Sequence, residues 1–155
     1  MERKLELRDI AGYLPYGLRC EIDKSFYDFD LEMANNWFGY YDKVNIFLRP
    51  LSNLYRTITH NRKEIVPIME LAKIARPDFD WVFKQEYCAY SKSQKTNFSF
   101  MNGFFSIVTD EMNCYYVMNE YLLFDYLHEL KIDYRGLIDA GLAVNVYDLE
   151  DNPYK

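Results

Sequence analysis

Two histidines are the residues with which this sequence could most readily do acid–base chemistry or bind a metal. His60 stands in the polar run 59–63, and neither it nor His128 has a second histidine, a cysteine or a carboxylate at metal-site spacing. Glu129 follows His128 directly, but adjacent helical residues point about 100 degrees apart and do not face each other. A zinc site and a His-based catalytic pair are therefore not expected.

Acids, nucleophiles and phosphate loops also give no recognisable site. Two groups of acids, Asp28 with Asp30 and Asp148 with Glu150 and Asp151, could hold a cation, but the glycine-pivoted calcium loop is absent. The patterns GxSxG, GxGxxG and GxxxxGK[ST] do not occur, so the usual nucleophile turn and phosphate cradles are missing. We expect no catalytic residue, no metal and no cofactor, and hence a protein that is not an enzyme.

Lysines and aromatic residues alternate in one region and could form a nucleic-acid site. Between residues 81 and 109, Lys84, Lys92 and Lys95 outnumber the single acid Glu86 (+3 − 1 = +2), whereas the remainder carries −6 − 2 = −8. Rings on one sheet face could stack on bases while the lysines meet phosphates. The aromatic residues concerned are Phe83, Tyr87, Tyr90, Phe98 and Phe100. The competing interpretation is a buried sheet with a flexible loop at 91–97.

A second candidate surface is acidic and aromatic. Trp37, Tyr40 and Tyr41 follow Asp28 and Asp30, and Trp and Tyr are residue types that dominate interface energetics. Ringed by carboxylates, they could bind a basic groove of a partner protein. The alternative is that the same rings close one side of the core.

Composition favours binding to a protein over binding to nucleic acid. Aromatic residues make up 18% of the chain, with fifteen Tyr, and so many hydroxyl-bearing rings cannot all be buried. The net charge of −6 repels phosphate backbones. Three features indicate a cytosolic protein without a membrane partner. The sequence starts with charged residues and has no apolar leader, no apolar run is long enough to span a membrane, and the three cysteines are far apart in sequence (Cys20, Cys88 and Cys114).

The elements that position these residues follow from periodicity and from turn residues. Helical spacing predicts two main helices at 67–75 and 120–130, the second capped by Asn119, and shorter helices at 9–14, 52–58 and 135–140. Alternation predicts strands at 18–22, 44–48, 83–90, 98–101, 104–108, 114–118 and 142–146. Asn102-Gly103 is a favoured hairpin turn. Residues 24–42 are expected to be irregular, and 59–63 to be a turn.

These elements predict an α+β fold in one undivided domain over residues 1–155. A small, mostly antiparallel sheet would combine the 81–118 hairpins with the remaining strands as edges, and the two main helices would pack on one face. Residues 148–155 are expected to be a polar tail.

Four segments resemble a family of small proteins encoded by phages, prophages and other mobile elements of Bacteroidota. The segments are Leu7–Leu18, Leu48–Leu54, Val66–Ile74 and Gly136–Ala143, in the same order as in that family. The family has no assigned activity, so no functional residues are implied. The resemblance implies an accessory protein in a bacterial host cytosol, and small phage proteins without an active site often block a host machine, as anti-CRISPR proteins do.

The expected function is non-enzymatic binding of a host macromolecule, with inhibition of a nucleic-acid-handling or defence complex as one form of it. A small nucleic-acid-binding module and an enzyme with an unfamiliar site are the two alternatives. The partner, the oligomeric state and the host pathway do not follow from the residues.

Overall fold

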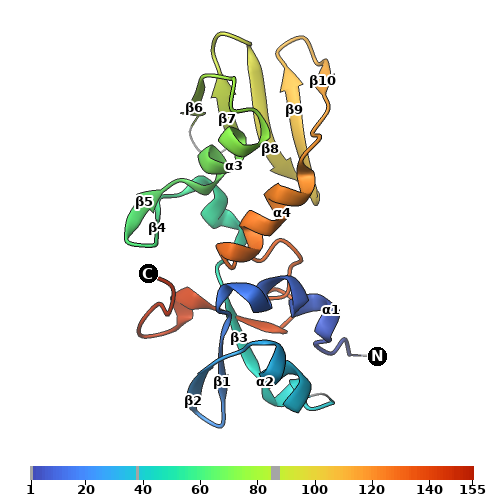
Figure 1. Cartoon of the computed structure of the whole chain (residues 1–155), viewed down its shortest axis with the longest axis vertical. Helices are drawn as coiled ribbons and strands as arrows, with labels where there is room; N and C mark the ends of the chain where they lie inside the picture. The colour runs from blue at the N-terminus through green and yellow to red at the C-terminus, as the bar shows by residue number, and fades with distance from the viewer. Residues whose placement is uncertain (1, 38, 85–87) are drawn as a thin grey trace. The chain divides into compact units, whose positions relative to one another are not determined.

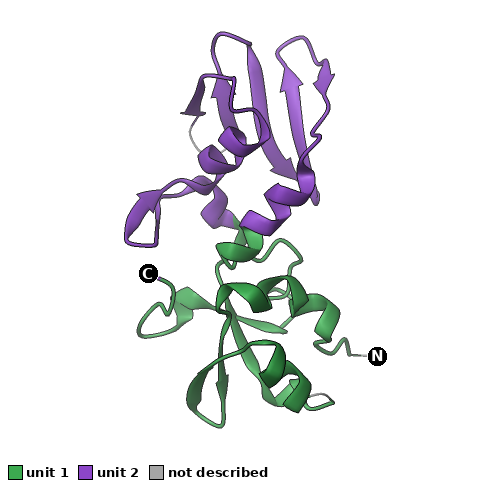
Figure 2. Ribbon diagram, in the orientation of Figure 1, with its two compact units in different colours: residues 1–51, 127–154 green, residues 52–126, 155 purple. Residues whose placement is uncertain are grey.

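The computed structural model describes residues 2–37, 39–84 and 88–155 and contains two compact units (Figures 1 and 2). Unit 1 contains Met1–Leu51 and Leu127–Tyr154, and unit 2 contains Ser52–Tyr126 with Lys155. Apart from Lys155, unit 2 is thus one run of chain inserted between the two parts of unit 1. The expectation of a single domain stays a prediction, because a compact unit is defined by its packing and not by independent folding.

Unit 1 is built on a four-stranded sheet in the order β11-β3-β1-β2. The pairs β1–β2 and β1–β3 are antiparallel, whereas β11 runs parallel to β3. The strands are β1 (Arg19–Ile22), β2 (Ser25–Asp28), β3 (Asn45–Leu48) and β11 (Ala143–Asn145). The helical segments are α1 (Leu7–Ile10), η1 (Ala11–Tyr16), α2 (Leu31–Asn36), η2 (Tyr41–Lys43) and η4 (Val146–Asp148).

The core of unit 1 follows from the alternation of its strands. In β1, Cys20 and Ile22 are buried, whereas Arg19 and Glu21 are partly exposed, as expected for a sheet with one covered face. The buried residues packed with them come mainly from α1, η1 and β3: Ile10, Tyr13, Leu14, Leu18, Ile46 and Leu48.

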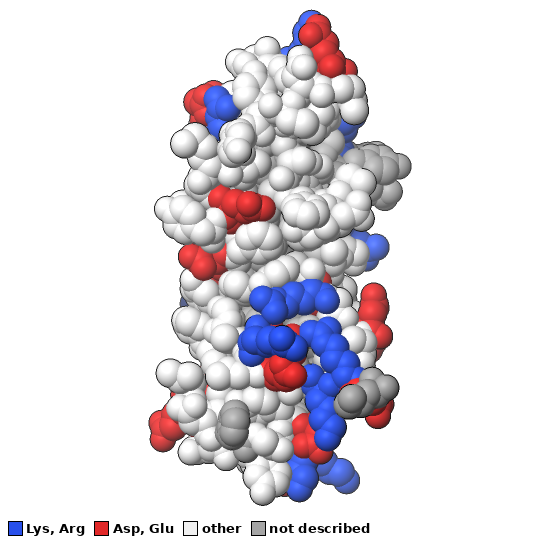
Figure 3. Space-filling view, turned by 90° about the vertical axis from the view of Figure 1, so that its right-hand side faces the viewer, with Lys and Arg blue, Asp and Glu red and all other residues white. Residues whose placement is uncertain are grey.

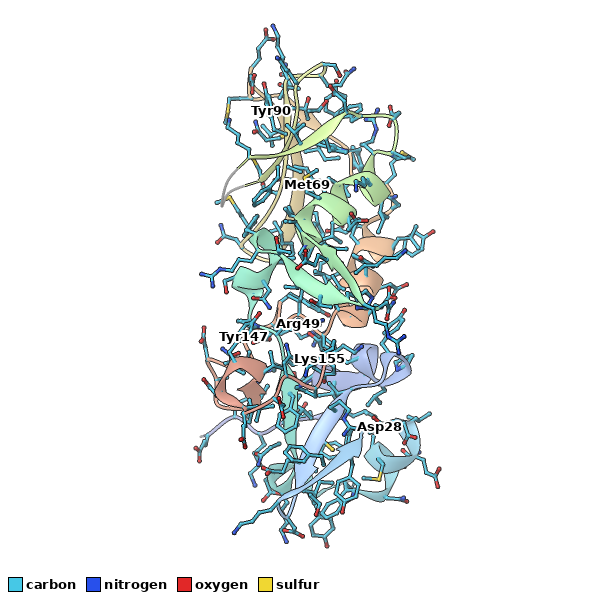
Figure 4. All side chains as sticks on the ribbon, turned by 90° about the vertical axis from the view of Figure 1, so that its left-hand side faces the viewer. Asp28, Arg49, Met69, Tyr90, Tyr147 and Lys155 are labelled. Atoms are coloured by element: carbon cyan, nitrogen blue, oxygen red, sulfur yellow. The ribbon has the colours of Figure 1, made fainter. Side chains whose placement is uncertain are left out.

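A buried arginine fixes the end of the chain within unit 1 (Figure 4). The Arg49 guanidinium donates to the carbonyl oxygens of Leu130 (2.7 Å) and Tyr154 (2.9 Å), and burial lowers its pKa from the usual value. The Tyr154 hydroxyl donates to the carbonyl of Phe47 and accepts from the N–H of Arg19, both at 2.8 Å. The expected polar tail therefore ends in a buried, hydrogen-bonded tyrosine.

Unit 2 contains a five-stranded antiparallel sheet in the order β10-β9-β8-β7-β6 and a separate two-stranded hairpin, β4–β5. The strands are β4 (Ile58–His60), β5 (Lys63–Ile65), β6 (Trp81–Lys84), β7 (Cys88–Ser91), β8 (Thr96–Met101), β9 (Phe104–Thr109) and β10 (Cys114–Tyr115). The helices are η3 (Leu51–Tyr55), α3 (Pro67–Ala75) and α4 (Glu120–Glu129); Leu51 and residues 127–129, at the ends of η3 and α4, belong to unit 1. Together, the two units confirm the α+β class.

The predicted hairpin turn sets the register of the large sheet. Asn102 and Gly103 have φ of 53° and 81°, the left-handed values that a two-residue turn between antiparallel strands requires, and Met101 stands opposite Phe104. Every second residue of β8 and β9 therefore points to the same face of the sheet.

The two main helices of unit 2 cover one face of this sheet, as predicted. The covered face carries Phe98, Phe100 and Phe105, which are buried. Helix α3 contacts β6, β7 and β8, and the ring of Phe124 in α4 lies 6.2 Å from Phe100 and 5.2 Å from Phe105. The bounds of α3 match the predicted 67–75.

Several local predictions are wrong. Residues 24–42, expected to be irregular, contain β2 and α2, and Asp30 begins α2 by accepting from the N–H of Met33. The turn expected at 59–63 is confirmed at Asn61-Arg62, which take positive φ without a glycine, but the flanking strands β4 and β5 were not predicted. The expected edge strands at 18–22, 44–48 and 142–146 belong to the sheet of unit 1.

Helix ends were also mispredicted. The expected helix at 135–140 is a series of turns, in which the Asp133 carboxylate accepts from the N–H groups of Leu137 and Ile138 at 2.9 and 2.8 Å. The side chain of Asn119 donates to the carbonyl of Ile74 (2.7 Å) instead of capping α4. The helix expected at 52–58 is the short η3. The strand expected at 83–90 is divided between β6 and β7, and residues 85–87 lie outside the described part.

Candidate protein-binding surface

The acidic and aromatic stretch of unit 1 does not form the exposed cluster of rings that its sequence suggested. Tyr41 is 7% exposed and donates to the carbonyl of Ala34 at 2.6 Å, and Trp37 is half-buried against the unit 1 core. Burial raises the pKa of Tyr41, as expected for a phenol removed from water. Tyr40 alone of these three rings is exposed, at 57%.

The two carboxylates of this stretch have local structural roles. Asp28 (Figure 4) forms an ion pair with Arg19 at 2.7 Å across the β1–β2 pair, and Asp30 caps α2. The alternative interpretation, in which the rings help to close the core, therefore accounts for Trp37 and Tyr41. Protein binding through Trp37, Tyr40, Tyr41, Asp28 and Asp30 stays a prediction, but only Tyr40 is free to anchor a partner without rearrangement.

Most of the rings of the second candidate site lie on the other side of the sheet from Lys84. Lys84 and Tyr90 share the open face, where the Lys84 ammonium lies 4.9 Å from the ring centroid of Tyr90. Phe98 and Phe100 are buried on the face that α3 and α4 cover, and Phe83 shares that face by register. A base-stacking platform needs rings and cations on one accessible face, so this arrangement does not supply it.

The remaining residues of that candidate site lie in or next to turns. Lys92 and Lys95 are exposed in the β7–β8 turn, and Lys95 has a positive φ of 49°. The hydroxyl of Tyr90 donates to Asp110 at 2.9 Å, which raises the pKa of the tyrosine. Tyr87 lies outside the described residues. The interpretation as a partly buried sheet with an exposed loop fits these positions.

The residues that could do chemistry are held by structural contacts. His128 Nε2 lies 2.7 Å from the hydroxyl of Tyr134, and the His60 ring packs against Tyr126 in unit 2. Within the part of the chain that the structure describes, no three His, Cys, Asp or Glu residues gather as a metal site. Nor does any described helix combine the length and apolar character needed to cross a bilayer.

A cavity of about 490 Å³ in unit 1 is lined by the N-terminal residues Lys4–Arg8 together with Gly39, Tyr41 and Asp42. Two of its charged groups, Glu6 and Arg8, pair with each other at 2.6 Å. The enzyme alternative stays a prediction, since these lining residues do not by themselves define a reaction.

The exposed apolar residues of unit 2 form a surface that the sequence analysis missed. Six large side chains from the end of β8, the start of β9, the segment between β10 and α4, and the start of α4 are exposed: Met101, Phe104, Tyr116, Met118, Tyr121 and Leu122. We call these six residues the β9–α4 surface. Tyr116 is 90% exposed, Met118 87% and Phe104 69%, so these side chains bury little of their apolar area within unit 2.

Two observations connect three of these six residues. Met101 and Phe104 are direct cross-strand partners on the open face of the sheet. Phe104 also lines a pocket of about 460 Å³ together with Tyr116 and Glu120, which joins β9 to the segment that leads into α4. On the face of unit 2 drawn in Figure 3, uncharged side chains cover most of the surface.

The sequence carries a signal that one ring of this hairpin is exposed, although not which ring. Phe104 and Phe105 are adjacent in a strand, so their side chains must point to opposite faces, and only one face is covered by helices. Similarly, Tyr121 and Leu122 lie beside the buried stripe of Leu123 and Leu127 in α4. Comparisons with models of protein families, with curated proteins and with solved structures give no match to this chain.

Proposed function

We propose that this chain is a protein-binding module whose β9–α4 surface contacts a macromolecular partner. The observation that carries the proposal is the exposure of two methionines, three aromatic rings and a leucine in unit 2, among which Met101, Phe104 and Tyr116 adjoin one another. Exposed patches of this kind mark interaction sites, and Met and aromatic residues are enriched in protein interfaces.

The rings of this surface have the chemistry of interface anchors. Tyr116 and Tyr121 present both an apolar ring and a hydroxyl, so a partner can bury the ring and still satisfy the polar end. An anchor of this type buried at the centre of an interface contributes roughly 2 kcal/mol or more, about a 30-fold change in Kd.

The biological setting that we propose remains a phage or mobile-element accessory protein in a bacterial cytosol. In that setting the partner is a host protein, and a nucleic-acid-handling or defence complex is the specific target class. The setting rests on the resemblance of the four segments named in the sequence analysis. The acidic net charge of −6 and the exposed rings suit a partner surface that is itself basic.

Capture from bacterial host lysate tests the proposal. Tagged wild-type protein is expected to recover a partner in stoichiometric amount, and the double variant Tyr116→Ser/Met118→Ser is expected to lose it. A matched control, Tyr27→Ser/Leu31→Ser, changes two exposed apolar residues of unit 1 and should retain the partner. Circular dichroism would verify that both variants fold. Recovery of abundant chaperones alone, or equal recovery with both variants, would contradict the proposal.

Direct nucleic-acid binding is the second candidate function, supported by the exposure of Lys92 and Lys95 in the β7–β8 turn and by the Lys84–Tyr90 pair on the open face of the sheet. Fluorescence anisotropy with single-stranded DNA and RNA tests it. Salt-sensitive binding that weakens in the Lys84→Ala, Lys92→Ala and Lys95→Ala variants would favour this candidate. Binding that these changes leave unaltered would exclude these lysines as its basis.

A further inference from the structure

The β9 edge of the large sheet is only partly paired. Strand β10 pairs with β9 at Val108 and Ile107 and ends at Tyr115, whereas β9 continues to Phe104 at the hairpin turn. Residues 104–106 of β9 therefore extend beyond the last paired position of β10. An edge of this kind can accept a further strand.

The register shows which backbone groups face the open side. The two residues that flank a two-residue hairpin turn exchange hydrogen bonds, so Met101 and Phe104 form a hydrogen-bonded pair. Phe105, one position on, turns its N–H and C=O away from β8. The same alternation continues to Thr109, whose N–H points to the β10 side and donates to the carbonyl of Asn113 at 2.8 Å.

Phe105 is thus the residue whose backbone can start a new ladder. Within the described residues, no backbone hydrogen bond outside the regular ladders involves it, and β10 has already ended two positions earlier, opposite Ile107. An incoming strand would exchange two hydrogen bonds with Phe105, as Tyr115 does with Ile107 in the existing pair.

The pocket of about 460 Å³ lies along this open edge. It is lined on one side by Phe104, Phe105, Ser106 and Ile107 of β9, and on the other by the segment from Cys114 to Val117 together with Glu120. The chain leaves the ladder after Tyr115, which opens space beside β9 where the next strand of the sheet would run.

The charge of this part of unit 2 indicates which kind of segment could bind at the open edge of β9. From Thr96 to Tyr126 the chain of unit 2 has no Lys or Arg and carries four acids, a net formal charge of 0 − 4 = −4. The acids are Asp110, Glu111, Glu120 and Asp125. Glu120 lines the pocket itself. A segment that is both apolar and basic matches these surroundings, whereas an acidic segment would meet like charges.

We propose that the partner contributes an extended segment, with Lys or Arg alternating with apolar residues, which adds to β9 as a further strand. This inference rests on the proposed function and names the class of partner and its mode of binding. Alternate side chains of the added strand lie on opposite faces of the sheet. One set meets the exposed Phe104, and the other set lies on the face covered by α4, near Glu120 at the start of that helix.

Titration with synthetic peptides tests the chemistry of the occupant. The probe is fluorescein-labelled VKVKVKVK, and VEVEVEVE is its charge-reversed control. The lysine peptide is expected to bind at least ~10-fold more tightly, and to weaken in about 1 M salt, where the Debye length falls to about 3 Å. Glu120→Gln should weaken binding several-fold, whereas Glu32→Gln, an exposed acid of unit 1, should leave it unchanged.

Amide hydrogen exchange tests the mode of binding at one residue. The lysine peptide is expected to slow exchange at the Phe105 N–H and to leave the N–H groups of Phe104 and Ser106, which face β8, unchanged. Equal binding of the two peptides, or binding without protection of Phe105, would overturn the proposal. Protection of Phe105 without peptide, together with a dimer in sedimentation analysis, would instead assign the edge to a second copy of this chain.

The two proposals fail in different ways. If the lysate complex forms and depends on Tyr116 and Met118 but the lysine peptide does not bind, strand addition is wrong and protein binding stands. If neither the peptide nor any lysate protein binds, both proposals are wrong.

Discussion

Replacing Gly12 with alanine tests the packing of unit 1 at a single atom. Gly12 lies in η1, directly against the imidazole of His128. A Cβ at this position would stand 2.5 Å from Nε2 and 2.7 Å from Nδ1 of the ring, and closer still to Cε1. Such distances are far inside van der Waals contact, so the ring or the η1 backbone has to move.

The ring has little room to move, which sets the size of the effect. His128 is held by the hydroxyl of Tyr134 at 2.7 Å and packs edge-on against Tyr13, with centroids 4.8 Å apart. Overpacking costs roughly 1–3 kcal/mol and a lost hydrogen bond about 1 kcal/mol. Alanine in place of glycine also stabilises the protein by about 0.4–1 kcal/mol, because it lowers the conformational entropy of the unfolded chain. We expect Gly12→Ala to destabilise unit 1 by about 2 kcal/mol.

Urea unfolding followed by tryptophan fluorescence measures this effect. The chain has two tryptophans, Trp37 in unit 1 and Trp81 in unit 2, so a Trp81→Phe background reports unit 1 alone. The control is the double variant Gly12→Ala/His128→Ala, in which removal of the ring makes room for the methyl group. The double variant should be no less stable than His128→Ala. The cost of Gly12→Ala would then differ by about 2 kcal/mol between the two backgrounds, which is the coupling energy of the two sites. Equal costs of Gly12→Ala in both backgrounds would refute the packing argument.

Three further predictions concern buried groups. Tyr154→Phe leaves two backbone groups of unit 1 without their partner and should destabilise it by about 1–3 kcal/mol in urea unfolding, whereas Tyr116→Phe on the surface should change stability by less than about 0.5 kcal/mol. A thiol reagent under native conditions should modify Cys114 rapidly and the two buried cysteines only in denaturant, and rapid modification of all three would contradict the burial described. Burial raises the pKa of Cys20 from 9.0 to about 11, so the buried thiol contributes its full share to the free energy of unfolding below pH 9, and this contribution is lost as pH rises toward 11. Cys20→Ala should therefore reduce the fall of the urea midpoint between pH 9 and 11, and an unchanged slope would refute this prediction.

The local chemistry of the sequence predicted much of unit 2. Asn102-Gly103 correctly placed the β8–β9 turn, because few other residue pairs take two positive φ values without strain. Pro67 and the apolar spacing that follows it correctly bounded α3. The β4–β5 hairpin was missed because Asn61 and Arg62 make a similar turn without glycine, which leaves no strong signal in the residue types.

Long-range pairing and exposure could not be predicted from the same patterns. The parallel pair β3–β11 joins Ile46 to Ala143, and no local feature of either strand specifies a partner so distant in sequence. The site was missed for a related reason. Periodicity separates one side of a strand from the other, but it does not say which side the helices will cover, and so Phe98 and Phe104 could not be told apart as buried and exposed.

The insertion of unit 2 into unit 1 has a consequence for synthesis on the ribosome. Strand β3 emerges early, but β11, its parallel neighbour, is translated only after the whole of unit 2. Until then the apolar side chains of Ile46, Phe47 and Leu48 have no complete sheet to enter, whereas unit 2 can already assemble from contiguous chain. The nascent polypeptide can therefore complete unit 2 first, and unit 1 closes only when residues 127–154 have been translated.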